Sequence, residues 1–171
     1  GSSKVDTLIG STGNDTYLID DTADVIVEGL NAGTDAVFSS ATYTLSANVE
    51  NLTLTGTGDI NGTGNALANT ITANSGINVL AGGGGNDTYN VDNTTDLIVE
   101  NLNEGTDLVQ SSATYTLSAN VENLTLTGSA NIDGTGNTFA NTIIGNSGNN
   151  VIDGGGGADA MSGGTGNDTY V

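Results

Sequence analysis

The chain has 171 residues, 27 of them glycine, and its 20 acidic residues face a single basic residue, for a net charge of −19. Aromatic residues make up only 4%, which excludes an ordinary globular core. The charge argues against binding to nucleic acid or to an anionic membrane, and no apolar run reaches the ~20 residues of a membrane-spanning helix. Because cysteine is absent, no disulfide can hold the fold together.

Beyond Gly1-Ser2-Ser3, which we expect to be a cloning remnant, the chain is organised as an internal duplication. Residues 13–84 align with residues 85–156 without a gap, at an offset of 72, and the string GNDTY begins at residues 13, 85 and 166. The last of these lies nine residues later than the offset requires, so residues 154–171 add further nonapeptides. We therefore expect residues 4–171 to form one domain built from a unit of about nine residues.

An apolar residue recurs within each long repeat about every nine residues, flanked by polar neighbours as in a short half-buried strand. In the first copy we place these inward residues, at position eight of each unit, at Tyr17, Ile26, Val37, Leu45, Leu54, Gly62, Ile71, Leu80 and Tyr89. Gly62 has no apolar side chain, and there we expect Ile60 to point inward. The residue two positions earlier is acidic in some units and apolar or Asn in others, which predicts uneven cation loading along the stack.

Turn residues, rather than helical periodicity, punctuate the chain. No ten-residue segment has a helical pattern, no proline interrupts the strands, and Gly, Asn, Asp and Thr recur every eight to eleven residues. A β-sandwich would share this spacing, but it gives no reason for a sustained nine-residue register. We therefore predict an all-β fold, a parallel β-roll or right-handed β-solenoid of about nine coils, each of about 18 residues.

Residues 154–171 contain two nonapeptides in one register, each reading G-G-x-G-x-D-x-U-x, where U is a large apolar residue. Glycine lets the first six residues turn tightly, and an aspartate, Asp159 or Asp168, ends each turn. Loop carbonyls with one carboxylate suit calcium, which takes six to eight oxygen ligands. This nonapeptide resembles the haemolysin-type calcium-binding repeat of RTX bacterial exoproteins, and the segment YTLSANVENLTLTG resembles the stretches between such repeats.

The resemblance implies calcium ions between loops stacked one coil apart, held by carboxylates and loop carbonyls of both. The implied side-chain ligands are Asp15, Asp24, Asp35, Asp87, Asp96, Asp107, Asn150, Asp159 and Asp168. The implied loop positions are Gly82, Gly84, Gly145, Ser147, Gly154, Gly156, Gly163 and Thr165. Loops 82–87, 154–159 and 163–168 should stack on loops 64–69, 136–141 and 145–150, respectively.

Asparagine ends each of these three lower loops, at Asn69, Asn141 and Asn150. Asparagine keeps an oxygen ligand but loses a charge, so a site that includes Asn150 should be weaker than one with two aspartates. The alternative is a ladder of hydrogen-bonded amides without metal, which would also include Asn78. The in-register acid pairs, Asp15 with Asp35 and Asp87 with Asp107, lie farther apart in sequence than one regular coil because the intervening loops are longer.

The sequence argues against an enzyme, since it lacks His and Cys and its acids recur without a unique pair. The resemblance implies a secreted extracellular protein, exported by a type I system, that folds on binding calcium. Our first hypothesis is a structural or interaction module of an adhesin, joined to other domains or binding a cell-surface or host ligand. An accessory secretion or folding segment of an extracellular enzyme or toxin is the alternative. An ice-binding solenoid is a distant third, because the threonine ranks alternate between faces and Phe38 interrupts one.

Overall fold

The computed structural model describes residues 4–171, so the expected cloning remnant at residues 1–3 lies outside the described part. Within it the regular secondary structure consists of short strands alone. Those of the first half are β1 (Thr7–Ile9), β2 (Thr16–Ile19), β3 (Val25–Val27), β4 (Ala36–Ser39), β5 (Tyr43–Thr44), β6 (Asn51–Leu54), β7 (Gly62–Thr63), β8 (Thr70–Thr72) and β9 (Val79–Ala81). Those of the second half are β10 (Thr88–Val91), β11 (Leu97–Ile98), β12 (Leu108–Ser111), β13 (Tyr115–Thr116), β14 (Asn123–Leu126), β15 (Gly134–Thr135), β16 (Thr142–Ile144), β17 (Val151–Asp153), β18 (Ala160–Ser162) and β19 (Thr169–Tyr170).

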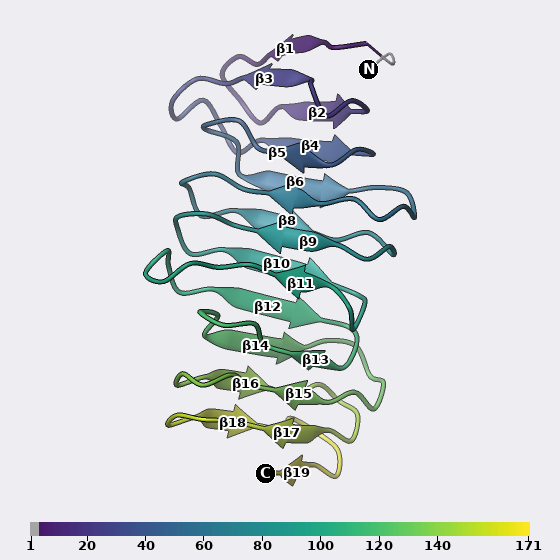
Figure 1. Ribbon diagram of the computed structural model, residues 1–171, viewed down its shortest axis with the longest axis vertical. Helices are drawn as coiled ribbons and strands as arrows, with labels where there is room; N and C mark the ends of the chain where they lie inside the picture. The colour runs from purple at the N-terminus through teal and green to yellow at the C-terminus, as the bar shows by residue number, and fades with distance from the viewer. Residues whose placement is uncertain (1–3) are drawn as a thin grey trace.

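The strands form a parallel solenoid in which successive strands alternate between two faces (Figure 1). One face is a continuous nine-stranded sheet that contains the even-numbered strands in order, from β2 to β18. The opposite face is divided into three sheets, β1–β3, β5–β7–β9–β11 and β13–β15–β17–β19. All the pairings are parallel, which confirms the predicted all-β solenoid of about nine turns of about 18 residues.

The coils are not all of one length, although the long repeat has no gap. On the nine-stranded face, Tyr89 of β10 pairs with Val109 of β12, and Val109 pairs in turn with Leu124 of β14. The next partners along the same row are Ile143 and Met161. The step from Tyr89 to Val109 is the longest and the step from Val109 to Leu124 the shortest. The extra residues of the longest coil lie in the loop between β11 and β12, and this loop builds the site described below.

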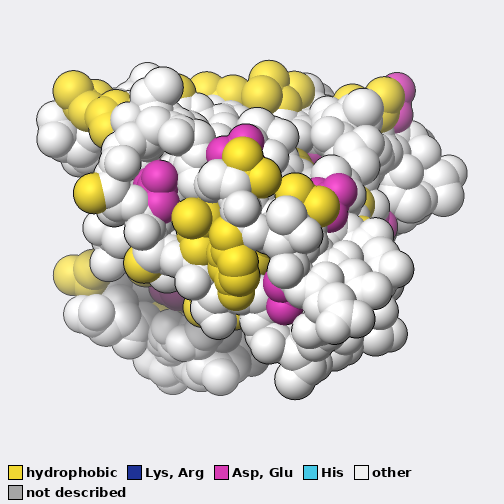
Figure 2. All heavy atoms as spheres, turned by 90° about the horizontal axis from the view of Figure 1, so that it is seen from below, with side chains coloured by type: hydrophobic (Ala, Val, Ile, Leu, Met, Phe, Trp, Pro, Cys, Tyr) yellow, Lys and Arg dark blue, Asp and Glu magenta, His cyan; other side chains and the backbone are white. Residues whose placement is uncertain are grey.

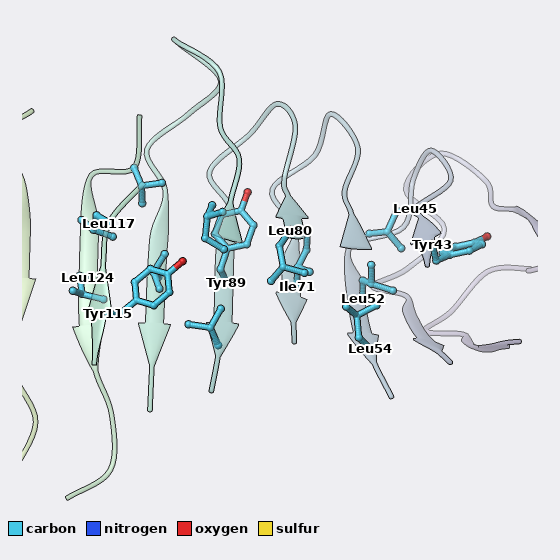
Figure 3. Packing of buried hydrophobic residues seen from close by; sticks show 14 of the residues in the cluster. Tyr43, Leu45, Leu52, Leu54, Ile71, Leu80, Tyr89, Tyr115, Leu117 and Leu124 are labelled. Carbon is cyan, nitrogen blue, oxygen red and sulfur yellow. The ribbon is translucent and has the colours of Figure 1, made fainter. Parts of the chain in front are cut away.

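The inward positions of both faces form one column of apolar side chains, which Figure 3 shows between the strands. Seen from the C-terminal end, apolar side chains gather in the middle with carboxylates around them (Figure 2). Leu52, Ile71 and Leu80 are fully buried in this column. An alternating strand pattern thus supplies the core, as the sequence predicts.

Our register at Leu45 and Leu54 is wrong by two residues. Leu52, not Leu54, pairs with Val37 and Ile71, and Tyr43 occupies the row to which we assigned Leu45. The turn between β4 and β5 spans only three residues, which moves β5 and β6 by two residues, and the predicted register returns at Gly62 of β7. A shift of two keeps the same face inward, so all four side chains are buried and the pattern alone could not reveal the slip.

Gly62 faces the core, as predicted, in register with Tyr43 on one side and Leu80 on the other. A Cβ atom at Gly62 would lie 2.9 Å from Cδ2 of Leu52, so the neighbouring leucine fills the space that a side chain would need. Ile60 packs against the same core, which confirms the expectation that it points inward.

The threonine ranks are divided between the two faces, as expected. Thr53 and Thr72 are neighbours on the nine-stranded sheet, where Phe38 precedes them in the same row, whereas Thr44 belongs to the opposite face. In the described part of the chain no helix is long and apolar enough to cross a membrane.

Candidate metal centres

Two clusters of three carboxylates lie on one edge of the solenoid, where the chain passes between its two faces. Asp87, Glu100 and Asp107 form the cluster in the second copy of the repeat, which we call the second cluster. A carboxylate oxygen from each lies within 4.8 Å of the others, and all three residues are buried. The same arrangement in the first copy, the first cluster, comprises Asp15, Glu28 and Asp35. The duplication therefore produces two copies of one site, with Asp15 as the one partly exposed member.

The loop before β10 is shaped by glycine so that the Asp87 carboxylate turns back over it. Gly83 and Gly85 have φ values of 91° and 119°, which side chains rarely tolerate. A Cβ atom at Gly82 would clash with Oδ2 of Asp87 and with the Tyr89 hydroxyl. The run of glycines is thus needed both for the turn and for the space that the carboxylate occupies.

Aspartates of the two clusters link neighbouring coils through one carboxylate oxygen, and in Asp35 and Asp87 the other oxygen is buried without a protein partner among residues 4–171. The backbone N–H of Asn69 donates to Oδ1 of Asp87 at 2.7 Å, and that of Asp87 donates to Oδ1 of Asp107 at 2.8 Å. In the first copy Asp15 N–H donates to Oδ1 of Asp35 at 2.8 Å. Buried oxygens without a hydrogen-bond partner in the described chain are Oδ2 of Asp24, Asp35, Asp87 and Asp96, and Oε2 of Glu100.

The charge of the second cluster is uncompensated. Burial raises the pKa of Glu100 to about 8 and that of Asp87 to about 6, with the nearby Asp107 carboxylate adding to both shifts. The Tyr89 hydroxyl donates a hydrogen bond to Glu100, and Tyr17 does the same to Glu28. The only basic residue of the sequence is Lys4, so no side-chain cation is at hand. Three buried carboxylates, of which Asp87 and Glu100 each have an oxygen without a protein partner in the described residues, fit a hard divalent cation.

Asp24 and Asp96 occupy the opposite edge and are also buried. Their Oδ1 atoms accept hydrogen bonds from the backbone N–H groups of Asp6, at 2.8 Å, and Asn78, at 3.0 Å. Burial raises the pKa of Asp96 above its ordinary value. Neither residue belongs to a cluster of three acids among the residues that the structure describes. Each therefore presents a single orphaned carboxylate oxygen.

The three predicted loop stackings are all present. The N–H groups of Asn69, Asn141 and Asn150 donate to Oδ1 of the aspartate one coil on, at 2.7, 2.9 and 3.0 Å. These acceptors are Asp87, Asp159 and Asp168. Three of the loop positions form inter-coil backbone hydrogen bonds: Gly84 and Gly156 donate to Asn65 and Asn137, and Gly145 donates to Ser162.

The remaining loop positions lie in the same stacked turns. The Ser147 hydroxyl donates to the Gly128 carbonyl at 3.4 Å, while Gly154 and Gly163 are buried and Thr165 is exposed. Asp159 and Asp168 are half-buried, and neither belongs to a cluster of three acidic side chains within residues 4–171. Their metal-ligand roles, and those of the loop carbonyls, remain predictions.

The Asn side chains are held by protein hydrogen bonds. Oδ1 of Asn150 accepts from the backbone N–H of Asn146 at 3.0 Å, and its Nδ2 donates to the Asn146 amide oxygen and the Ile132 carbonyl. Asn69, Asn78 and Asn141 are bonded in corresponding ways. Both ends of each amide thus contact protein, and the proposed role of Asn150 as a ligand remains a prediction.

Sequence reasoning missed the glutamates. Glu28 and Glu100 follow the inward residues Ile26 and Ile98 by two positions, and this even spacing returns a side chain to the inward side of an extended chain. That spacing was the available signal. The sequence analysis expects the loops that contain Glu28 and Glu100 only to lengthen their coils, and it assigns these glutamates no role as ligands.

Comparison with known proteins gives one result. The family model for the RTX calcium-binding nonapeptide repeat matches in four copies, at residues 1–17, 63–98 and 135–170. These ranges cover slightly more than half of the chain, and the second includes Asp87 and Asp96. No curated protein and no solved structure matches.

Proposed function

This chain belongs to the RTX calcium-binding nonapeptide repeat family, and from that premise we propose that it is a non-catalytic segment of a secreted bacterial protein that folds on binding calcium outside the cell. RTX repeats bind calcium, and the parallel solenoid fits a calcium-binding structural repeat. The observation that carries the proposal is the cluster of Asp87, Glu100 and Asp107, three buried carboxylates with no basic partner in the described chain.

We assign the strongest calcium binding to the two three-carboxylate clusters. In the second copy Asp87, Glu100 and Asp107 would hold the ion, and in the first copy Asp15, Glu28 and Asp35. The calcium ion supplies positive charge that the chain lacks. The residues bring their oxygens together from two neighbouring coils, so the ion stabilises the contact between those coils.

Folding and calcium binding are coupled in this proposal. Without calcium, the net charge of −19 and the buried carboxylates oppose folding, and a thin core offers limited compensation. An ion that binds the folded state alone lowers the free energy of that state relative to the unfolded chain. In low cytosolic calcium the chain would remain unfolded and fit for export, and in high extracellular calcium it would fold.

The proposed role within an adhesin rests on the elongated shape of the solenoid and on its exposed apolar side chains. The solenoid is an elongated stack, and pairs of apolar side chains are exposed at matching positions of the two copies, Val25 with Val27 and Leu97 with Val99. Such repeated lateral patches suit contact with other domains or with a surface ligand. The segment would serve as a spacer that presents these contacts.

A calcium titration followed by far-UV circular dichroism tests the proposal. We expect strand signal to appear as calcium is added and to disappear on addition of EGTA. Magnesium should be much less effective, because it requires near-ideal octahedral geometry and releases its water reluctantly. An equal strand signal in EGTA and in calcium would show that folding does not depend on the ion.

A further inference from the structure

The long loop that carries two of the proposed calcium ligands also forms the wall of a pocket that calcium binding does not use. The pocket has a volume of about 220 Å³. Asn101, Leu102, Asn103 and Gly105 of the loop line one side, and Asn120, Glu122 and Phe139 from the following coils line the other. Glu100 and Asp107 flank this loop segment, so the pocket and the acid cluster share one element.

An apolar surface is exposed at the pocket. The Phe139 side chain is 43% exposed and that of Leu102 is 68% exposed, although both are large apolar residues. An aromatic ring offers a flat face to C–H groups, and a leucine beside it adds apolar contact. These two side chains suit a ligand with a non-polar face.

The polar groups of the pocket are held in position and retain free hydrogen-bonding capacity. Nδ2 of Asn120 donates to the Glu100 carbonyl at 2.9 Å, and Oε2 of Glu122 accepts from Asp107 N–H at 2.8 Å. These bonds leave Oδ1 of Asn120 and Oε1 of Glu122 without a partner in residues 4–171. The backbone of Asn103 is also unusual, with φ at 65°. Fixed amide and carboxylate oxygens suit a ligand rich in hydroxyl donors.

We propose that this pocket binds an uncharged hexopyranose unit of a glycan. A pyranose ring combines a C–H face with hydroxyl groups around its edge, which matches a phenylalanine ring beside amide and carboxylate groups. The carboxylate of Glu122, the adjacent Asp107 and the net charge of −19 disfavour anionic sugars. A neutral sugar avoids this repulsion and can donate to the same carboxylate.

Binding of the sugar should depend on calcium, and this part of the inference rests on the proposed function. Glu100 and Asp107 lie at either end of the loop segment that lines the pocket. An ion between them fixes the ends of that segment and with them the pocket wall. Without calcium we expect no sugar binding.

The first repeat provides matched substitutions. At the positions that align with the pocket-lining residues, the first repeat has the same side chains, except for Leu67 in place of Phe139 and Gly29 in place of Asn101. Phe139→Leu therefore introduces the side chain that the first repeat already has at the aligned position. Leu67→Phe makes the reverse change, and circular dichroism in calcium shows whether both variants fold.

Saturation-transfer NMR on the full chain in calcium tests the inference, with D-glucose, D-galactose and D-mannose as probes and D-glucuronate as the anionic comparison. We expect transfer to at least one neutral hexose, none to glucuronate, and affinity weaker by about fivefold or more in Phe139→Leu. Transfer that is unchanged in Phe139→Leu, or stronger for glucuronate, overturns the inference. Calcium-induced folding without transfer to any hexose also overturns it and leaves the proposed function intact, whereas loss of calcium-induced folding itself would overturn the proposed function.

Discussion

At the scale of single residues, Glu100 distinguishes the candidate site from a pair of stacked aspartates. It comes from the long loop after β11 and places a third carboxylate within 4.8 Å of those of Asp87 and Asp107. Burial raises its pKa to about 8, a sign that its charge lacks compensation in the metal-free fold. A bound divalent cation would supply that compensation.

We predict that Glu100→Gln weakens calcium binding at the second cluster by about tenfold or more, because it removes a charged ligand and keeps the shape. Glu104→Gln is the matched control, since it removes the same charge from the same loop outside the cluster. Isothermal titration with calcium measures both affinities. Equal losses in the two variants would mean that only overall charge matters.

As the pH rises, calcium affinity should increase, whereas the stability of the metal-free fold should decrease. Protons compete with the ion for Glu100 and Asp87, whose pKa values are raised to about 8 and about 6, so calcium affinity should increase between pH 6 and pH 8 with release of protons. Without calcium, these raised values mean that the folded state binds more protons than the unfolded chain. The metal-free fold should therefore be more stable near pH 5 and lose stability as the pH rises through 6 to 8.

Calcium titrations at several pH values measure the first trend. The strand signal that persists in EGTA at each pH, followed by far-UV circular dichroism, measures the second. Calcium affinity that is constant from pH 6 to pH 8 would contradict the first. Metal-free stability that increases over the same range would contradict the second.

At the scale of the elements, a tyrosine in one coil pairs with a glycine in the next, once in each copy of the repeat. Tyr115 of β13 pairs with Gly134 of β15, as Tyr43 pairs with Gly62. A Cβ atom at Gly134 would lie 3.1 Å from Cδ2 of Leu124 and 3.3 Å from Cγ2 of Ile143, both buried in the core. The glycine thus makes room for larger neighbours and is not needed for an unusual φ.

Gly134→Val should overpack this layer and lower the free energy of unfolding in calcium by about 1–3 kcal/mol. Thr135→Val is the control, because Thr135 is the next residue of the same strand and only half-buried. Urea unfolding in saturating calcium measures the difference. A destabilisation by Thr135→Val as large as that by Gly134→Val would show that the strand, rather than the core position, is sensitive.

At the scale of the whole molecule, the two acid clusters share one design but differ in their surroundings. Asp87, Glu100 and Asp107 are all buried, whereas Asp15 keeps part of its surface in water. The loop of residues 64–69 in the preceding coil stacks on the loop that carries Asp87, and the backbone N–H of Asn69 donates to Asp87. Water screens the attraction between an exposed carboxylate and a cation, so the second cluster should bind calcium more tightly.

Calcium titration should therefore show two classes of strong site. Asp87→Asn should remove the tighter class and Asp15→Asn the weaker one, with the other class retained in each variant. Isothermal titration of the two variants beside the unchanged chain makes the comparison. If Asp15→Asn removes the tighter class, burial does not determine the order of affinity.

The sequence by itself determined the solenoid, because an apolar residue in every nine and the gapless internal duplication admit few other folds. It also predicted which loops stack, since loops 82–87 and 64–69 differ by one coil length. It could not place the register at Leu52 and Leu54, because both leucines face inward and a slip of two residues leaves the pattern unchanged.

The gathering of Glu100 with Asp87 and Asp107 was decided only by the tertiary structure. Neither the spacing from Asp87 to Glu100 nor that from Glu100 to Asp107 is a coil length. Their meeting depends on how the long loop between β11 and β12 folds back toward the preceding turn, which carries Asp87. Local periodicity describes strands, whereas the path of an irregular loop is set by what it packs against, so the carboxylate that completes the cluster could not be read from spacing alone.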